Sequence, residues 1–156
     1  MSAKMVREEL VGEVYDKIVT TPAKVSRGQT IKDAAEAILK VPVTRKVYVV
    51  DSTGKLEGVI KLETILRHIG YRMGVRESGI SSYFKMLSEV LKEKVEDIME
   101  KPITVTKNDT IARATKLMVE NHINDLPVID ENGILLGELN SMEILSVSIK
   151  LFEEKP

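Results

Sequence analysis

The stretch GELNSMEIL, Gly137 to Leu145, decides how this chain folds, because the stretch GVIKLETIL, Gly58 to Leu66, repeats its frame earlier in the sequence. Each stretch has a glycine, two further strand-type residues, four variable positions and then Ile-Leu. The shared residues suit the end of a strand followed by the start of a helix that buries one face. The variable positions differ sharply in charge, so the two copies are expected to differ in chemistry there.

The repeat extends well beyond this turn. Val47 to Leu66 aligns without a gap with Leu126 to Leu145, and upstream Ala23 to Ile31 lies over Ile103 to Ile111. A repeat of this length predicts two similar supersecondary units, each too small to bury its apolar faces alone. The identical pairs in the gapless part are Val49/Val128, Asp51/Asp130, Gly54/Gly133, Leu56/Leu135, Gly58/Gly137, Ile65/Ile144 and Leu66/Leu145.

The first copy predicts the order β-α-β-β-α. A short strand is expected at Lys24 to Ser26, and Thr30 and Asp33 form a capping-box signal for the helix that follows. The turn DSTG between two β-type runs predicts a hairpin, and a last helix is expected from Leu62 to Ile69. The predicted apolar face of the first helix is Ile31, Ala34, Ala35, Ile38 and Leu39.

The second copy predicts the same order, so the expected fold class is α+β. Its elements are a strand at Thr104 to Thr106, a helix ending near His122, a hairpin with the turn DENG, and a helix from Ser141 to Phe152. The predicted apolar positions of its first helix are Ile111, Ala114, Thr115 and Met118.

Three segments follow from the repeat. Residues 1–76 form the first repeat with an N-terminal segment, residues 77–94 a connecting element, and residues 95–156 the second repeat. The run SSYFKMLSEVLKEK in the connection predicts an amphipathic helix with a modest apolar face, for which dimerisation is one use.

Composition excludes several classes of protein. The chain has 156 residues, of which 43% are hydrophobic and 30% charged, as in ordinary globular domains. It has no cysteine, so disulfides, thiolate catalysis and cysteine-ligated metals are excluded. No apolar run is long enough to span a bilayer, and the N-terminus lacks a signal-type apolar core, so a soluble cytoplasmic protein without membrane contact is expected.

Charge is divided unevenly along the chain, although the net charge is only −1. Residues 22–76 hold 11 Lys/Arg and 5 Asp/Glu, whereas residues 77–156 hold 9 and 15. The basic half could bind an anionic ligand or attract the acidic half of another chain. The uneven charge could also have arisen without function on two solvated surfaces, and charge alone does not decide among these three explanations. Nucleic acid is the least favoured partner, because aromatics are only 4% and do not alternate with basic residues.

The ordered motifs resemble a tandem pair of cystathionine-β-synthase (CBS) domains, often called a Bateman module. The resemblance is carried by DIMEKPITVTKNDTI (Asp97 to Ile111), LPVIDENGILLG (Leu126 to Gly137) and GELNSMEIL, and by TIKDAAEAIL and VYVVDSTGKLEGVI in the first copy. It covers almost the whole chain and implies a stand-alone module without catalytic function. The two repeats of one chain would pack pseudo-symmetrically through their sheets, and two such chains would pair further into a homodimer.

The resemblance also implies that this chain senses the energy state of the cell and regulates an unknown partner protein. Clefts between the repeats would bind AMP, ADP, ATP or S-adenosylmethionine, with no resident cofactor required. The alternative function is that of a constitutive interaction or scaffold module, in which the nucleotide sites have lost their binding residues and no ligand is sensed.

In such modules the strand-to-helix turn carries a hydroxyl residue followed three residues later by a carboxylate that binds ribose. Asn140 and Glu143 occupy these positions in the second copy, and the same pair equally fits a helix capping box that requires no ligand. Thr104, Val105, Val128 and Leu139 would complete this site, the three apolar residues lining the base.

The first copy has Lys61 and Thr64 at the two motif positions, so it lacks the carboxylate. The resemblance places Lys24 and Arg45 near the same cleft, where cations would favour a polyphosphate over a neutral nucleoside. An ordinary exposed lysine at a strand end is the competing interpretation of Lys61. The two histidines are too far apart for a metal site, and no phosphate-binding glycine loop, nucleophile elbow or paired catalytic carboxylates are present.

Overall fold

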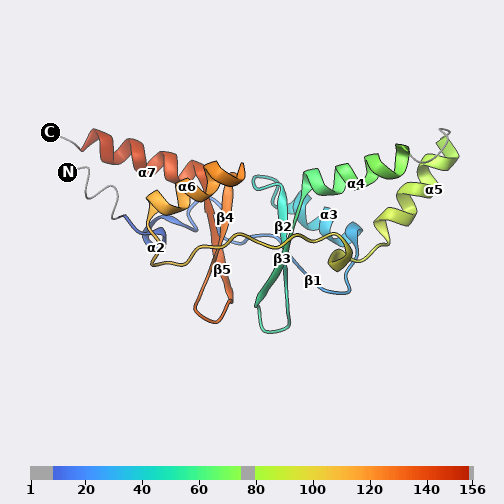
Figure 1. The fold of residues 1–156 in the computed structure, drawn as a ribbon, viewed down its shortest axis with the longest axis horizontal. Coiled ribbons are helices and arrows are strands. Elements are labelled where there is room, and N and C mark those ends of the chain that lie inside the picture. Colours follow the sequence, from blue (N-terminus) through green and yellow to red (C-terminus); the bar gives the residue numbers. More distant parts are fainter. Residues whose placement is uncertain (1–8, 75–79, 155–156) are drawn as a thin grey trace. The chain divides into compact units, whose positions relative to one another are not determined.

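The chain forms two compact units in the computed structural model, which describes residues 9–74 and 80–154. One, here called the central unit, spans Ala23–Lys101, and the other, the terminal unit, combines Met1–Pro22 with Pro102–Pro156. The N-terminal segment, which was expected with the first repeat, is thus grouped with the second. Both units are α+β, which confirms the predicted fold class (Figure 1).

The central unit contains a three-stranded sheet in the order β1-β2-β3, with β1 parallel and β3 antiparallel to β2. Helices α3 and α4 contact this sheet, and α5, predicted in the connection, packs against both helices. Helix α4 is five residues longer than predicted, since it ends at Gly74 and not at Ile69. The elements are β1 (Lys24–Ser26), α3 (Ile31–Lys40), β2 (Lys46–Val50), β3 (Leu56–Lys61), α4 (Leu62–Gly74), α5 (Ile80–Leu91) and the 3-10 turn η1 (Val95–Asp97).

The terminal unit has a two-stranded antiparallel sheet, β4-β5, with α6 and α7 against it. The predicted capping box of Thr30 and Asp33 is confirmed at α3, and His122, near which the next helix was expected to end, is the left-handed C-cap of α6. The elements are α2 (Val11–Val14), α6 (Ile111–Asn121), β4 (Asp125–Ile129), β5 (Leu135–Asn140) and α7 (Ser141–Glu153).

The strand predicted at Thr104 to Thr106 is reduced to a single parallel bridge between Val105 and Val128. In the central unit the N–H of Tyr48 donates to the carbonyl of Ala23 (2.9 Å). The residue equivalent to Tyr48 in the second repeat is Pro127, which has no N–H. The missing donor explains why only the first repeat completes this third strand.

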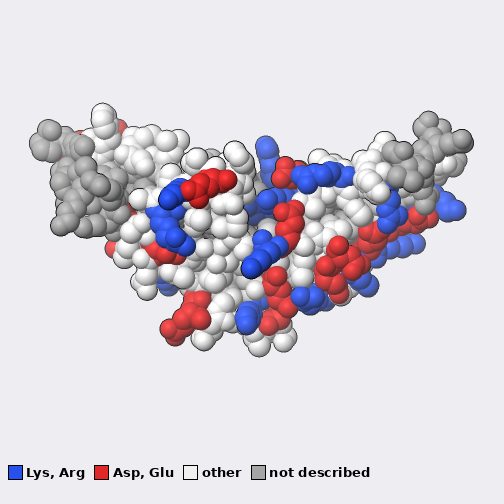
Figure 2. Space-filling view, viewed as in Figure 1, with Lys and Arg blue, Asp and Glu red and all other residues white. Residues whose placement is uncertain are grey.

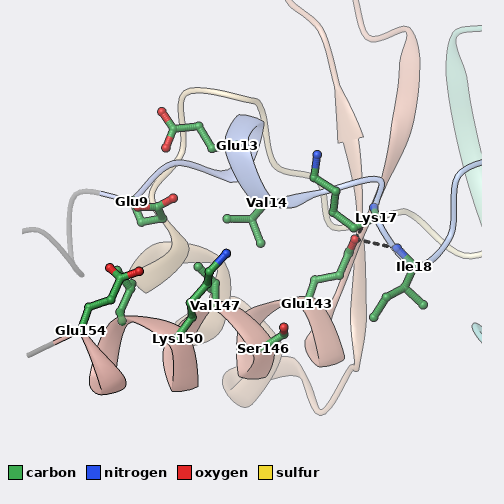
Figure 3. Close-up of a pocket in the computed structure, with 11 residues that line it drawn as sticks. Glu9, Glu13, Val14, Lys17, Ile18, Glu143, Ser146, Val147, Lys150 and Glu154 are labelled. Atoms are coloured by element: carbon green, nitrogen blue, oxygen red, sulfur yellow. Dashed lines mark hydrogen bonds between the residues drawn. The ribbon is translucent and has the colours of Figure 1, made fainter.

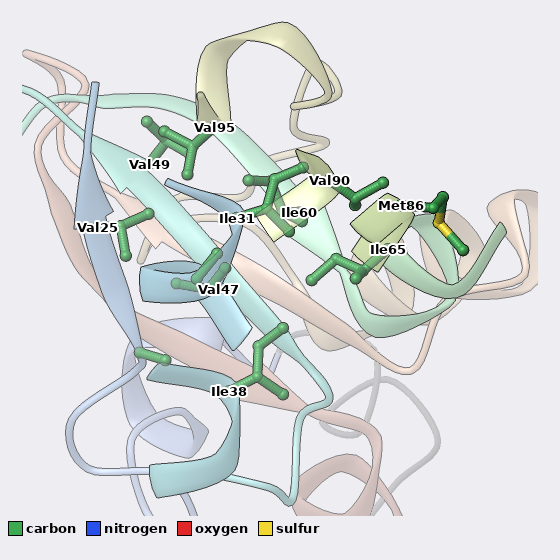
Figure 4. Packing of buried hydrophobic residues seen from close by; sticks show 12 residues of the cluster. Val25, Ile31, Ile38, Val47, Val49, Ile60, Ile65, Met86, Val90 and Val95 are labelled. Carbon is green, nitrogen blue, oxygen red and sulfur yellow. The ribbon is translucent and has the colours of Figure 1, made fainter. Parts of the chain in front are cut away.

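Each unit has its own apolar core. In the central unit, the core joins the sheet to α3, α4 and α5, and Met86 and Val90 attach α5 to it (Figure 4). In the terminal unit, Ile111, Ala114 and Met118 of α6 face Leu126 and Leu139. The predicted inner helix positions are therefore confirmed for six of the nine residues, whereas Ala35 is only half-buried, Leu39 is 76% exposed and Thr115 is also exposed.

The segment that precedes each repeat in the sequence packs in the unit that holds the other repeat. We call residues 9–18 and 93–101 the leading segments. In the terminal unit the carbonyl of Glu9 accepts from the N–H of Ile111 (2.8 Å), and in the central unit the carbonyl of Glu93 accepts from the N–H of Ile31 (2.9 Å). The two leading segments thus meet their units in the same way.

The glycines of the repeated frame make room for these segments. A Cβ on Gly58 would lie 2.6 Å from Sδ of Met99, and a Cβ on Gly137 would lie 2.9 Å from Cε2 of Tyr15. Met99 and Tyr15 belong to the two leading segments. The shared glycine of GVIKLETIL and GELNSMEIL therefore permits close approach of a leading segment to the strand.

The helices of the described residues include none that is both long and apolar enough to cross a membrane.

Candidate functional site

The strand-to-helix turn of the terminal unit is a buried capping box. The side chain of Asn140 accepts from the N–H of Met142 (2.8 Å), and Oε1 of Glu143 accepts from the N–H of Asn140 (2.7 Å). Asn140 and Glu143 are each only 3% exposed. The capping interpretation of this pair is confirmed by these bonds, and the ribose role of both residues stays a prediction.

The second carboxylate oxygen of Glu143 binds the leading segment. Oε2 accepts from the backbone N–H of Lys17 (2.5 Å) and of Ile18 (3.0 Å), as Figure 3 shows for Ile18. One buried carboxylate therefore satisfies three backbone donors and ties α7 to residues 17 and 18. A ligand hydroxyl at Glu143 would have to share or replace these acceptor sites.

The turn of the central unit carries the reverse arrangement. Here the carboxylate comes from the leading segment: Oε1 of Glu100 accepts from the hydroxyl of Thr64 (2.6 Å), and Oε2 lies 3.7 Å from Nζ of Lys61. Lys61 and Thr64, both predicted site residues, are thus brought together around Glu100. Sequence reasoning missed Glu100 because no spacing relates it to the motif.

The predicted cations share one end of the central sheet. Lys24 opens β1, Arg45 directly precedes β2, and the register pairs Lys46 with Lys61 at the end of β3. Lys24 and Arg45 are exposed. Asp and Glu lie among Lys and Arg over the visible face of this unit, so that face is not continuously basic (Figure 2).

The predicted base-lining residues lie in the core of the terminal unit. Val105, Val128 and Leu139 are at most 1% exposed and pack in one core with residues of α6. Strand alternation turns Val128 and Leu139 toward the helices. Thr104 is half-buried beside them. As contacts of a ligand base, these residues stay a prediction.

A hollow of about 400 Å³ lies between α2 and α7 of the terminal unit (Figure 3). Glu143 forms part of its wall, with Glu9, Glu13 and Glu154 around it. Burial, a hydrogen bond with Glu13 and the nearby charge of Glu154 raise the pKa of Glu9. This hollow was not predicted, because the carboxylates come from both ends of the chain.

Other polar groups have structural roles. His68 contacts Glu93 (2.6 Å), which also pairs with Arg72. Asp51 and Asp130 accept hydrogen bonds inside their hairpin turns, as predicted, and bonds to Thr53 and Lys55 lower the pKa of Asp51. No group of three His, Asp or Glu residues within the described ranges is arranged to hold a metal ion.

Comparison with known families matches a CBS domain model to residues 11–71 and 95–150. A protein of Methanocaldococcus jannaschii is 39% identical over 71 residues, a match that covers 45% of this chain and 42% of that protein. A second protein of the same organism is matched over 43% of its length. The chain thus spans less than half the length of these curated relatives.

Solved structures with the same fold cover nearly the whole chain. A CBS domain-containing protein from Thermotoga maritima is 30% identical, with a TM-score of 0.72 and coverage of 95% of this chain and 97% of that one. The protein CBSX2, solved in complex with AMP, is 22% identical, with a TM-score of 0.71 and coverage of 92% and 98%. CBSX2 comes from Arabidopsis thaliana.

Proposed function

Because the chain belongs to the CBS domain family, we propose that it is a non-enzymatic regulatory module that senses an adenosine-containing ligand. AMP, ADP, ATP and S-adenosylmethionine are the candidates, and a structurally similar protein of the family binds AMP. Ligand binding would favour one of two states of the module, and a partner protein would bind the two states differently.

One observation carries the proposal: the central unit gathers cationic side chains at the end of its sheet where α4 begins. Lys24, Arg45 and Lys61 share this end. A helix N-terminus and nearby cations together favour phosphate oxygens. The first repeat is therefore the proposed phosphate-binding site, with ATP preferred to AMP.

Titration calorimetry with AMP, ADP, ATP and S-adenosylmethionine tests this function. We expect Lys61→Ala to weaken ATP binding more than AMP binding, because the ammonium group acts on the distal phosphates. Lys55→Ala is the matched control, since Lys55 is an exposed lysine in the hairpin turn at the other end of β3. An equal loss of ATP and AMP affinity in Lys61→Ala would count against phosphate recognition by Lys61.

The second repeat would hold a ribose through Asn140 and Glu143. This role requires the ligand hydroxyls to compete for the carboxylate of Glu143 with the three backbone N–H groups that already donate hydrogen bonds to it. If Glu143→Ala lowers stability but leaves the affinity for every adenosine ligand unchanged, the residue acts in capping alone.

An interaction module without ligand is the second candidate. It is favoured by the internal pairing at both turns, where Glu143 binds the leading segment and Glu100 binds Lys61 and Thr64. Thermal unfolding separates the two functions. A ligand at a hundredfold excess over its Kd stabilises the native state by about 2.7 kcal/mol, whereas an interaction module shows no shift with any adenosine ligand.

A homodimer would cover the outer helix faces of each unit. Leu39 and Leu66 are 76% and 59% exposed in the central unit, and Val119 and Leu145 are 69% and 61% exposed in the terminal unit. Apolar faces of this kind are typical of interfaces. Light scattering should give a dimer that Leu145→Lys weakens, whereas Leu136→Lys, which changes an exposed strand residue, should leave it intact.

A further inference from the structure

The turn between β3 and α4 already holds an anion, which is the carboxylate of Glu100. One oxygen accepts from the hydroxyl of Thr64 (2.6 Å), and the other lies 3.7 Å from the ammonium group of Lys61. Thr64 is the third residue of α4, so the carboxylate lies at the first turn of this helix. A hydroxyl, a cation and a helix N-terminus are all groups that favour negative charge.

The backbone of Glu100 fixes this carboxylate in place. Its N–H donates to the carbonyl of Val59 (2.9 Å), and its carbonyl accepts from the N–H of Val59 (3.0 Å). These two bonds do not involve the side chain. The carboxylate is therefore presented by a leading segment that stays attached when the side chain is changed.

The contact is also weak enough to be replaced. The side chains of Lys61 and Glu100 are 26% and 42% exposed, and ion pairs so close to water contribute little. A ligand with several negative charges gains more from the same cation than one carboxylate does. A ligand with a single anionic group gains little by the exchange.

We propose that Glu100 is an internal competitor that must be displaced from Lys61 and Thr64 before an anionic ligand binds there. Glu100 then sets the affinity of this turn and selects polyphosphates against singly charged ligands. This inference rests on the proposed function for the location of the phosphates. It adds a specificity-determining residue that does not belong to the repeated motif.

Glu100→Gln tests the inference, because the amide keeps the size of the side chain and removes its charge. Inorganic tripolyphosphate is the probe, since it carries the charge of a nucleotide without the nucleoside. We expect roughly five- to tenfold tighter binding to Glu100→Gln than to the unaltered chain, from the loss of a weak pair and of a like charge. Protection of the Val59 amide from hydrogen exchange verifies that the leading segment is still attached.

Two further variants isolate the turn. Glu36→Gln removes an equal charge from the exposed face of α3 and should leave the affinity unchanged. The double variant Lys61→Ala/Glu100→Gln should not show the tighter tripolyphosphate binding that is expected for Glu100→Gln alone. An unchanged affinity in Glu100→Gln, an equal gain in Glu36→Gln, or a gain that persists without Lys61 would each overturn the inference.

The same titrations with ATP, AMP and S-adenosylmethionine concern the proposed function separately. If tripolyphosphate binds more tightly to Glu100→Gln while no adenosine ligand binds either protein, Glu100 is a competitor and nucleotide sensing is wrong. If ATP binds both proteins equally and tripolyphosphate shows no gain, nucleotide sensing holds and the competitor role is wrong.

Discussion

Oε2 of Glu143 accepts a hydrogen bond from the backbone N–H of Ile18 at 3.0 Å, across 125 positions of sequence. The equivalent turn of the central unit joins Thr64 to Glu100 at 2.6 Å. In one repeat the turn supplies the carboxylate, and in the other the leading segment supplies it. The variable positions of the repeated frame therefore determine how each unit holds its leading segment.

Replacement of Glu143 should be costly. Glu143→Ala leaves the backbone amides of Lys17 and Ile18 and the buried N-cap amide of Asn140 without their acceptor. A lost helix cap costs about 1 kcal/mol, and unsatisfied buried donors cost about 1–3 kcal/mol. We expect the free energy of unfolding to fall by about 2–4 kcal/mol, measured by urea denaturation.

Glu153→Ala is the control for this substitution, because Glu153 is an exposed glutamate near the other end of α7. It should change stability by less than about 0.5 kcal/mol. Equal effects of the two substitutions would show that the hydrogen bonds of Glu143 contribute nothing beyond its place in a helix.

The architecture of each unit was predictable because local signals agreed with the final packing. The capping pair Thr30 and Asp33 predicts the start of α3, and the turn residues at Asp51 and Asp130 predict the two hairpins. Periodicity identified the inner residues of α3 and α6. These features depend on residues only a few positions apart, which a single sequence displays.

The leading segments and their contacts were not predictable in the same way. Nothing in the spacing of Glu100 or Tyr15 indicates which repeat each residue will contact. The sequence showed that Gly58 and Gly137 occupy equivalent positions of the two repeats. The reason that both positions require glycine is the close approach of Met99 and Tyr15, which are distant in sequence. The loss of the strand at Val105 was visible in principle, because Pro127 lacks the required donor.

The two frame glycines should differ in their tolerance to alanine. In Gly137→Ala the new Cβ lies 2.9 Å from the ring of Tyr15, whereas in Gly58→Ala it meets the flexible side chain of Met99. Overpacking against a rigid ring costs about 1–3 kcal/mol, and a methionine adjusts more easily. Thermal unfolding should show the larger loss for Gly137→Ala. A larger loss for Gly58→Ala would contradict this explanation.

Helix α5 should be an integral part of the central unit. Met86 packs in the core and is 1% exposed (Figure 4). Phe84 on the same helix is 62% exposed. Met86→Ala should cost about 2–5 kcal/mol by urea denaturation, because it leaves a cavity. Phe84→Ala is the control and should change stability little. Equal losses would show that α5 is held by its exposed face instead.

Stability at acid pH should depend on the capping box of α3. Hydrogen bonds from the backbone and hydroxyl of Thr30 lower the pKa of Asp33 below its ordinary value of 3.8. The ionised form is thus favoured by folding, so its contribution is present above pH 3.8 and is lost as pH falls through the lowered pKa. Asp33→Asn should therefore lower the unfolding midpoint at pH 6, and its difference from the unaltered chain should shrink below pH 3.8. A difference that is the same at both pH values would contradict this assignment.

Glu9 should show the opposite dependence on pH. Burial, together with Glu13 and Glu154, raises its pKa above the ordinary value of 4.5, so the folded chain binds this proton more tightly than the unfolded chain. The free energy of unfolding then falls as pH rises from 4.5 through the raised pKa. Glu9→Gln, which is neutral throughout, should be more stable than the unaltered chain at pH 7, by less than about 1 kcal/mol because the group is near water. Urea denaturation at pH 7 and below pH 4.5 measures the difference in the free energy of unfolding between the two chains, which should vanish at the lower pH. A Glu9→Gln chain that is less stable at pH 7 would show that the charge of Glu9 is favourable in the fold.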